Sequence, residues 1–168
     1  AWRFASAFDS STTFHHAVLE SPNGAFAIHD VAGYAMGVGD IARSRYVLNF
    51  GANPYESHYL YVPFIQRLID ARINLGAKLV TFDVRISQTA GKSDEWFPIV
   101  PGTDGAVALA MAYVIASEDL WDKEFIERQT NTSPAKLLRH LGAYTPKKAE
   151  ALSGVRAADI KRIALEFA

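Results

Sequence analysis

Apolar residues in the middle of the chain form short continuous runs separated by a segment of helical spacing. The run at 45–54 ends in a glycine turn, and the run at 77–84 ends on an aspartate, so both are typical of buried strands. Between them, residues 59–75 carry apolar side chains at helical spacing and precede Gly76, a common helix terminator. This order predicts a βαβ unit with a right-handed crossover.

Two further elements extend this unit. Residues 96–100 form a shorter apolar run with Pro98, which favours an edge strand because proline cannot donate a backbone hydrogen bond. A helix is predicted to follow from an N-cap at Thr103 or Asp104, with strong helix formers at 106–116. The pattern therefore favours an α/β fold with a Rossmann-like, open and mostly parallel sheet flanked by helices.

The remaining segments frame this core. The N-terminal quarter holds a short amphipathic stretch and several glycines, and we expect it to be irregular. The C-terminal third is predicted to be helical, with helices at 120–129, from Thr145 to Gly154 and from about 157 onward. We therefore predict a single α/β domain over 1–168, composed of an irregular segment 1–44, a βαβ core 45–117 and a helical part 118–168.

Composition narrows the classes of partner. With 49% hydrophobic residues over 168 positions, the chain can bury a sizeable core. The net charge is −1 without runs of like charge, which gives no indication of nucleic-acid binding. The absence of cysteine excludes an iron–sulfur cluster within the chain, and no apolar run is long enough for direct membrane insertion. Because the chain begins without methionine and ends within a predicted helix, we expect it to be part of a longer protein.

Two glycine-containing motifs resemble nucleotide-binding loops. The stretch TAGKS at 89–93 ends like a phosphate-binding loop, but Ile86 stands where that loop requires its first glycine, and a strand follows instead of a helix. The stretch GVGDIA at 37–42 has dinucleotide-binding spacing but precedes a strand instead of following one. Neither is predicted to hold a nucleotide, and the histidines lack the spacing of a zinc site.

Three other loops follow the predicted strands, at 51–57, 83–89 and 101–104. In an open parallel sheet the ligand binds at the carboxyl ends of the strands, so we expect the three loops to share one edge. Their residues suit a nucleotide, because Gly51 allows close approach of a phosphate and Asp83 can accept from ribose hydroxyls.

Polar residues in these loops indicate the base. Asn53 and Ser57 offer donors near a predicted helix N-terminus, where an anion is favoured. Asp104 can accept from both the N1–H and the 2-amino group of guanine, a match that adenine lacks. Ordinary turn and cap residues are the alternative interpretation of each position, whereas the set as a whole favours a guanine nucleotide.

Three stretches together resemble one protein family: YVLNFGANPYESH, LVTFDVRISQTAGKSDEWFPIVPGTDGAVALAMAYVIASEDLWDKEFI and YTPKKAEALSGVRAADIKRIALEFA. In this order they are similar to the molybdopterin-containing oxidoreductases of the dimethyl sulfoxide reductase family, in its polysulfide and thiosulfate reductase-like branch. The resemblance covers the chain from about Phe14 onward. It implies one domain of a multidomain catalytic subunit that transfers an oxygen atom, or hydride and electrons.

The resemblance also implies a cofactor, a molybdenum or tungsten atom held between two molybdopterin guanine dinucleotides. This domain would bind the guanosine diphosphate arm of one of them, with loop 51–57 at the phosphates, 83–87 at the ribose and guanine side, and 102–104 at the base. The implied cofactor-binding residues are His16, Gly51, Ala52, Asn53, Pro54, Glu56, Ser57, Asp83, Val84, Arg85, Ser87, Thr89, Gly102, Thr103 and Asp104.

The family's metal ligand falls in the first segment. Relatives carry it in a pattern N-x-F-x-H-x-x-x-C, which TTFHHAVLE at 12–20 resembles, with His16 in the histidine place and Glu20 in the cysteine place. A glutamate carboxylate suits a hard, high-valent molybdenum ion, so Glu20 is the implied ligand. A slip of one residue places Leu19 there and leaves no protein ligand, and Ser21 is a third alternative.

The expected partners follow from the same resemblance. They are the remaining domains of the catalytic subunit, an iron–sulfur electron-transfer subunit and a small-molecule substrate, with the iron–sulfur clusters outside this chain. The isolated chain is expected to be inactive, since half of the cofactor cradle and the electron path lie elsewhere. The alternatives are a stand-alone guanine-nucleotide-binding module without redox activity and, less well matched, a fragment of a Rossmann-like dehydrogenase.

Overall fold

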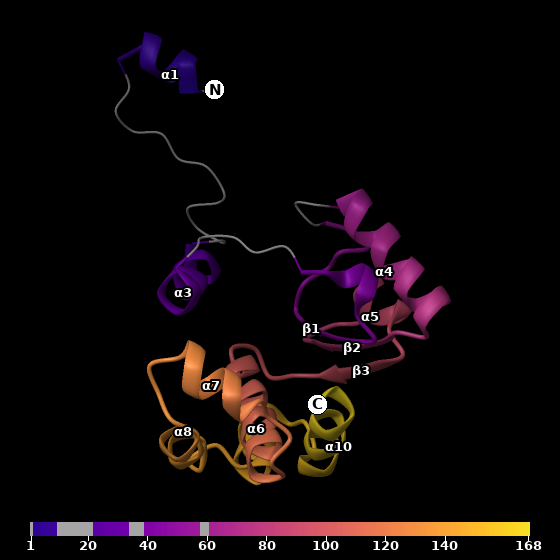
Figure 1. Cartoon of the computed structure of the whole chain (residues 1–168). Coiled ribbons are helices and arrows are strands. Elements are labelled where there is room, and N and C mark those ends of the chain that lie inside the picture. Colours follow the sequence, from indigo (N-terminus) through magenta and orange to yellow (C-terminus); the bar gives the residue numbers. More distant parts are fainter. Residues whose placement is uncertain (1, 10–21, 34–38, 58–60) are drawn as a thin grey trace. The chain divides into compact units, whose positions relative to one another are not determined.

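The computed structural model describes residues 2–9, 22–33, 39–57 and 61–168, and it divides the chain into two compact units, Ala1–Asp40 and Ile41–Ala168. The first unit contains helices α1 (Trp2–Ala7) and α3 (Pro22–Ala32) (Figure 1). The sequence predicted an irregular segment over 1–44, and helix α3 corrects this. The helix begins with a proline and is followed by a glycine, and both are common at helix ends. The sequence prediction missed it because glycines in this segment are also typical of loops.

The second unit is built on a parallel sheet. Strands β1 (Tyr46–Phe50), β2 (Lys78–Asp83) and β3 (Glu95–Pro98) lie in the order β1-β2-β3, and helix α4 (Tyr61–Leu75) connects the first two. The register pairs Phe50 with Phe82 and Asp83 with Pro98. The predicted α/β fold with an open parallel sheet is confirmed, and Pro98 is the last residue of an outer strand of the described sheet.

The other helices of this unit surround the sheet (Figure 1). They are α5 (Gln88–Lys92), α6 (Asp104–Ser117), α7 (Lys123–Gln129), α8 (Pro134–Leu141), α9 (Pro146–Ser153) and α10 (Ala157–Phe167), with the 3-10 turn η1 (Ile41–Arg43) before β1. Helices α5 and α8 were not predicted. Lys92 is the last residue of α5, whose first turn is capped by the Ser87 side chain. None of the helices in the described ranges is both long and apolar enough to cross a membrane.

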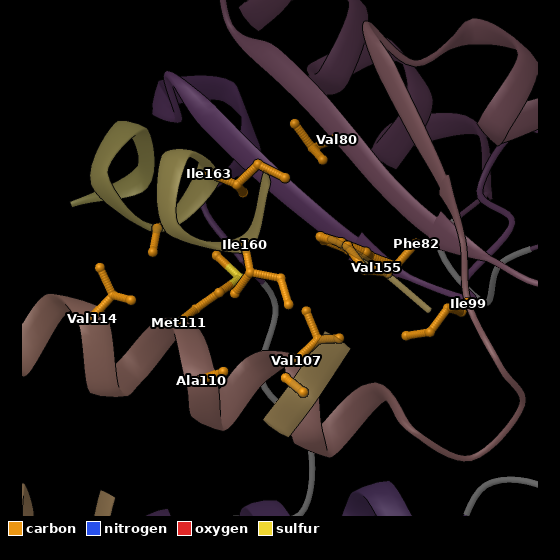
Figure 2. Close-up of a cluster of buried hydrophobic side chains, with 12 residues drawn as sticks. Val80, Phe82, Ile99, Val107, Ala110, Met111, Val114, Val155, Ile160 and Ile163 are labelled. Atoms are coloured by element: carbon orange, nitrogen blue, oxygen red, sulfur yellow. The ribbon is translucent and has the colours of Figure 1, made fainter. Parts of the chain in front are cut away.

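One face of the sheet packs against the C-terminal helices. Val80 and Phe82 of β2 meet side chains of α6 and α10 in a single buried cluster (Figure 2). The Phe82 ring is fully buried and stacks between Phe50 and Phe97, at centroid distances of 4.8 and 5.5 Å. Successive strand residues point to opposite faces, so Leu79, Thr81 and Asp83 are buried on the side that carries α4 and α5.

Charged side chains join the amino edge of the sheet to α10. Lys78 Nζ lies 2.6 Å from Glu95 Oε1 and 2.6 Å from Glu166 Oε2. The Arg162 guanidinium lies 2.5 Å from Glu95 Oε2 and 2.7 Å from Glu166 Oε1, and the Tyr46 hydroxyl donates to Glu166 at 2.9 Å. Hydrogen bonds from Lys78 and then Arg162 lower the pKa of Glu166 to about 2, and the one from Arg162 lowers the pKa of Glu95.

This charged cluster predicts acid sensitivity. The two carboxyl groups have lower pKa values in the folded chain than in the unfolded chain, so below about pH 4.5 the unfolded chain binds more protons and acid favours unfolding. The stabilisation is complete above about pH 4.5 and is lost as the pH falls toward about 2. Urea unfolding over this pH range is expected to show a falling free energy of unfolding, with a shallower fall in Glu166→Gln.

The control for this experiment is Glu124→Gln, which removes one partner of an exposed ion pair with Arg128 on α7. Exposed pairs of this kind contribute little to stability, so this variant should keep the pH dependence of the unsubstituted chain. An identical fall in Glu166→Gln and the unsubstituted chain would contradict the assignment to the cluster at the amino edge.

Candidate functional site

The three strands are parallel, so their carboxyl ends lie at one edge of the sheet. Loop 51–57 begins there with Gly51, whose φ of +64° belongs to the left-handed region and whose N–H donates to the Phe82 carbonyl at 2.9 Å. Two amides, Glu56 N and Ser57 N, donate to the Asn53 carbonyl at 2.9 and 2.8 Å and close a tight turn. The shape of the loop is therefore fixed by its own backbone and by its anchor on β2.

Loop 83–89 is bonded directly to loop 51–57. Asn53 Oδ1 accepts from the Thr89 hydroxyl at 2.6 Å and from the Thr89 amide at 3.2 Å. On the outer side, the Asn53 side-chain amide donates to the Glu56 carboxylate, which lies 3.5 Å from the guanidinium of Arg85. The sequence prediction that these two loops meet at one edge agrees with these contacts.

Asp83 and Ser87 shape the turn after β2. Both are buried, and the Ser87 hydroxyl donates to Asp83 Oδ2 at 2.8 Å while accepting from Ala90 N at 3.2 Å. The exposed residues of this loop are Val84, Arg85, Ile86 and Gln88. A ligand at this edge would therefore meet Arg85 and the turn backbone more readily than the Asp83 carboxylate.

The third loop leads into α6. Gly102 has φ +80°, and a Cβ built there or at Gly51 would meet no atom within 4 Å, so both glycines leave open space where another group can approach. Thr103 occupies the N-cap position without a side-chain capping bond, and its hydroxyl donates to the Val100 carbonyl at 2.6 Å. Among the described residues, no hydrogen bond or ion pair engages the half-buried Asp104 carboxylate or joins this loop to the other two.

Sequence reasoning missed three polar residues beneath these loops: Asn49, Thr81 and Ser93. Asn49 Nδ2 donates to the Ala52 carbonyl at 2.8 Å and to Thr81 Oγ1 at 3.3 Å. The hydroxyls of Thr81 and Ser93 lie 2.6 Å apart, and Ser93 Oγ donates to the Thr89 carbonyl at 2.8 Å. The available signal was a polar residue inside each apolar strand, in YVLNF and in KLVTFD.

The implied metal-side residues His16 and Glu20 lie outside the described residues, as do the alternatives Leu19 and Ser21. Within the described ranges there is no group of three or more histidine and carboxylate side chains that could hold a metal ion. The metal ligand therefore stays a prediction.

A hollow of about 440 Å³ is lined by Tyr55 of loop 51–57 and by residues near the amino end of β2, among them Arg72, Ala77 and Asp94. Arg72 and Asp94 form an ion pair of 3.1 Å, and Asp94 Oδ2 also accepts from Leu79 N at 2.7 Å. These two charges are satisfied by each other and by the sheet, so their role is structural.

Comparisons with known proteins match almost the whole chain. The family model for molybdopterin oxidoreductases matches residues 3–158. The chain is 38% identical over 167 residues to the thiosulfate reductase molybdopterin-containing subunit of Salmonella typhimurium, covering 99% of this chain and 21% of that protein. It is 33% identical over 151 residues to the arsenate respiratory reductase molybdopterin-containing subunit of Chrysiogenes arsenatis, covering 77% of this chain and 18% of that protein.

The fold agrees with a solved relative. Acetylene hydratase from Pelobacter acetylenicus superposes with a TM-score of 0.78 at 28% identity, covering 98% of this chain and 22% of the hydratase. The chain thus spans about a fifth of the length of these relatives. The resemblance seen in the sequence is confirmed: this chain belongs to the molybdopterin oxidoreductase family.

Proposed function

We propose that the carboxyl edge of this sheet binds the guanosine diphosphate arm of one molybdopterin guanine dinucleotide, within the catalytic subunit of a molybdenum or tungsten oxidoreductase. The observation that carries the proposal is the Asp104 carboxylate in the first turn of α6, which has no hydrogen bond or ion pair within the described residues and stands next to a glycine that leaves open space. A carboxylate at this position can accept both donors on the edge of guanine.

The charges at this edge suit the proposed ligand. Arg85 carries a guanidinium that is 65% exposed beside loop 51–57, and its partner among the described residues is Glu56, at 3.5 Å. A diphosphate could draw this guanidinium into charge-assisted hydrogen bonds, which are stronger than a loose surface pair. Asp104 lies in the first turn of α6, at the positive end of the helix dipole, and its two carboxylate oxygens can each accept a hydrogen bond.

The residues described here would bind and orient the cofactor. When bound, the molybdopterin centre supplies oxygen-atom or hydride and electron transfer, and the protein supplies position and electrostatics. Glu20 as metal ligand and His16 as a pterin contact belong to the same proposal. So do the expected partners, which are further domains of the catalytic subunit, an iron–sulfur electron-transfer subunit and a small-molecule substrate.

The test is the cofactor content of the full-length protein, purified with its bound cofactor. Metal analysis combined with acid extraction is expected to give molybdenum or tungsten together with guanosine monophosphate, in a ratio of about two nucleotides per metal for a cofactor with two dinucleotides. Metal and pterin without guanine would contradict the dinucleotide. Bound GDP without metal or pterin would support the stand-alone nucleotide-binding module instead.

A further inference from the structure

A closed ring of hydrogen bonds lies beneath the first two loops of the candidate site. We propose that this ring positions loop 51–57 for the nucleotide, and that Thr89, predicted from the sequence to contact the cofactor, acts instead through Asn53. The inference rests on the proposed function. The polar ring consists of Asn49, Ala52, Asn53, Thr81, Thr89 and Ser93, and it is closed by the peptide bond between Ala52 and Asn53.

Donor counting fixes the direction of every bond in the polar ring. The single hydroxyl proton of Ser93 goes to the Thr89 carbonyl, so Thr81 must donate to Ser93 while accepting from Asn49. Thr89 Oγ1 likewise donates to Asn53 and accepts from the amide of Tyr55 at 3.2 Å. Each hydroxyl is therefore both donor and acceptor, and no bond can reverse without breaking another.

Burial makes the polar ring costly to disrupt. The side chains of Thr81 and Thr89 are 0% exposed and Asn49 is 8% exposed, so a lost partner here is not replaced by bulk water. Among the described residues, no buried side-chain nitrogen or oxygen lacks a hydrogen-bond partner. A fully satisfied polar network in a buried position favours one geometry, because a shifted loop would leave several groups unpaired.

The Thr89 hydroxyl makes the hydrogen bond that links the polar ring to the Asn53 side chain of loop 51–57. Without its hydroxyl, Asn53 Oδ1 keeps only the longer bond from the Thr89 amide, and the Tyr55 amide loses an acceptor. Asn53 is also the residue whose carbonyl holds Glu56 N and Ser57 N. A substitution at Thr89 is therefore expected to alter the geometry of loop 51–57, the loop proposed to bind the phosphates. The Thr89 side chain itself is buried and inaccessible to a ligand. It is a positioning residue.

The test compares Thr89→Val with Thr89→Ser in the full-length protein. Each variant is prepared without its cofactor and titrated with GDP. Valine keeps the shape of threonine and removes the hydroxyl, whereas serine keeps the hydroxyl. We expect Thr89→Val to weaken GDP binding by about tenfold, the loss expected when buried groups are left without one partner, and Thr89→Ser to stay within about threefold of the unsubstituted protein. Backbone amide exchange at Glu56 and Ser57 should accelerate in Thr89→Val alone.

The matched control is Ser153→Ala on α9. Ser153 is 1% exposed, donates to the Ala149 carbonyl and accepts from Val155 N, so it is an equally buried hydroxyl outside the candidate site. This variant and Thr89→Val are both expected to lower Tm, but Ser153→Ala should leave GDP affinity unchanged.

The outcomes separate the two proposals. Unchanged GDP affinity and unchanged amide exchange in Thr89→Val would overturn the positioning role and leave the proposed function intact. Equal loss of GDP affinity in Ser153→Ala would also overturn it, since general destabilisation would then explain the effect. If the unsubstituted protein does not bind GDP, the proposed function is contradicted. The backbone amide exchange rates at Glu56 and Ser57 then test by themselves whether the polar ring holds loop 51–57 in place.

Discussion

Replacing Asp104 with asparagine is expected to weaken GDP binding by about tenfold to a hundredfold, which corresponds to the ~1–3 kcal/mol lost when a charged hydrogen-bond partner is removed. The asparagine side chain is nearly the same size, but it offers one acceptor oxygen and places an NH₂ group opposite a guanine donor. Because the Asp104 carboxylate has no hydrogen bond or ion pair within the described part of the chain, the substitution should leave the fold itself nearly unchanged.

The readout that identifies the contact is base preference. Inosine diphosphate lacks the 2-amino group of guanine, so the unsubstituted protein should bind GDP more tightly than inosine diphosphate, and Asp104→Asn should lose most of that difference. Guanosine monophosphate released from the purified holoprotein should fall in parallel. Asp122→Asn is the control, because Asp122 also stands at a helix N-terminus, where it caps α7 by accepting from Phe125 N. A retained preference for GDP in Asp104→Asn would contradict the guanine contact.

Local sequence patterns were sufficient for the framework of the second unit. The apolar runs around β1 and β2 and the helical spacing of α4 each span consecutive residues, so the βαβ unit could be predicted with boundaries displaced by only a few residues. Once three strands are parallel, the loops at their carboxyl ends must share an edge. The location of the candidate site followed from topology and needed no knowledge of side-chain contacts.

The interior of the site could not be predicted in this way. The bonds of the polar ring join residues far apart in the chain, such as Asn53 and Thr89, which are 36 positions apart, and Asn49 and Thr81, which are 32 positions apart. A threonine in a strand has the same local signature whether it is bonded to a distant serine or packed among apolar groups. The sequence therefore predicts Thr89 as a cofactor contact but gives no sign of the hydrogen bond from its hydroxyl to Asn53.

Short helices were missed for a related reason. Helix α5 spans five residues, too few for a hydrophobic period, and it depends on the Ser87 cap and on packing against β2. Helix α8 spans only eight residues, although Ser133 at its N-cap, Pro134 at its first position and apolar residues four positions apart, Leu137 and Leu141, all signal it. Helix α5 is therefore specified by its cap and tertiary contacts more than by pattern, whereas α8 carried a local signal that the prediction did not use.

Phe82→Ala is expected to lower the free energy of unfolding by about 3–5 kcal/mol, the range for truncating a fully buried phenylalanine. Phe82 is 0% exposed and lies in the central strand of the described sheet, where its ring contacts Phe50 on one neighbouring strand and Phe97 on the other. The cavity would open between the sheet and α6, since Val107 and Met111 belong to the same cluster (Figure 2). Urea unfolding at neutral pH measures the change.

Phe125→Ala is the matched control, because the Phe125 side chain on α7 is 57% exposed and its removal should change stability by less than about 0.5 kcal/mol. The same pair of variants also tests whether the candidate site depends on the core beneath it. Gly51 N is bonded to the Phe82 carbonyl, a backbone contact that the alanine retains, so residual GDP binding by folded Phe82→Ala protein should stay close to that of the unsubstituted chain. A loss of stability no larger than in Phe125→Ala would contradict the packing of the sheet on α6, and a selective loss of GDP binding with full stability would place Phe82 in the site.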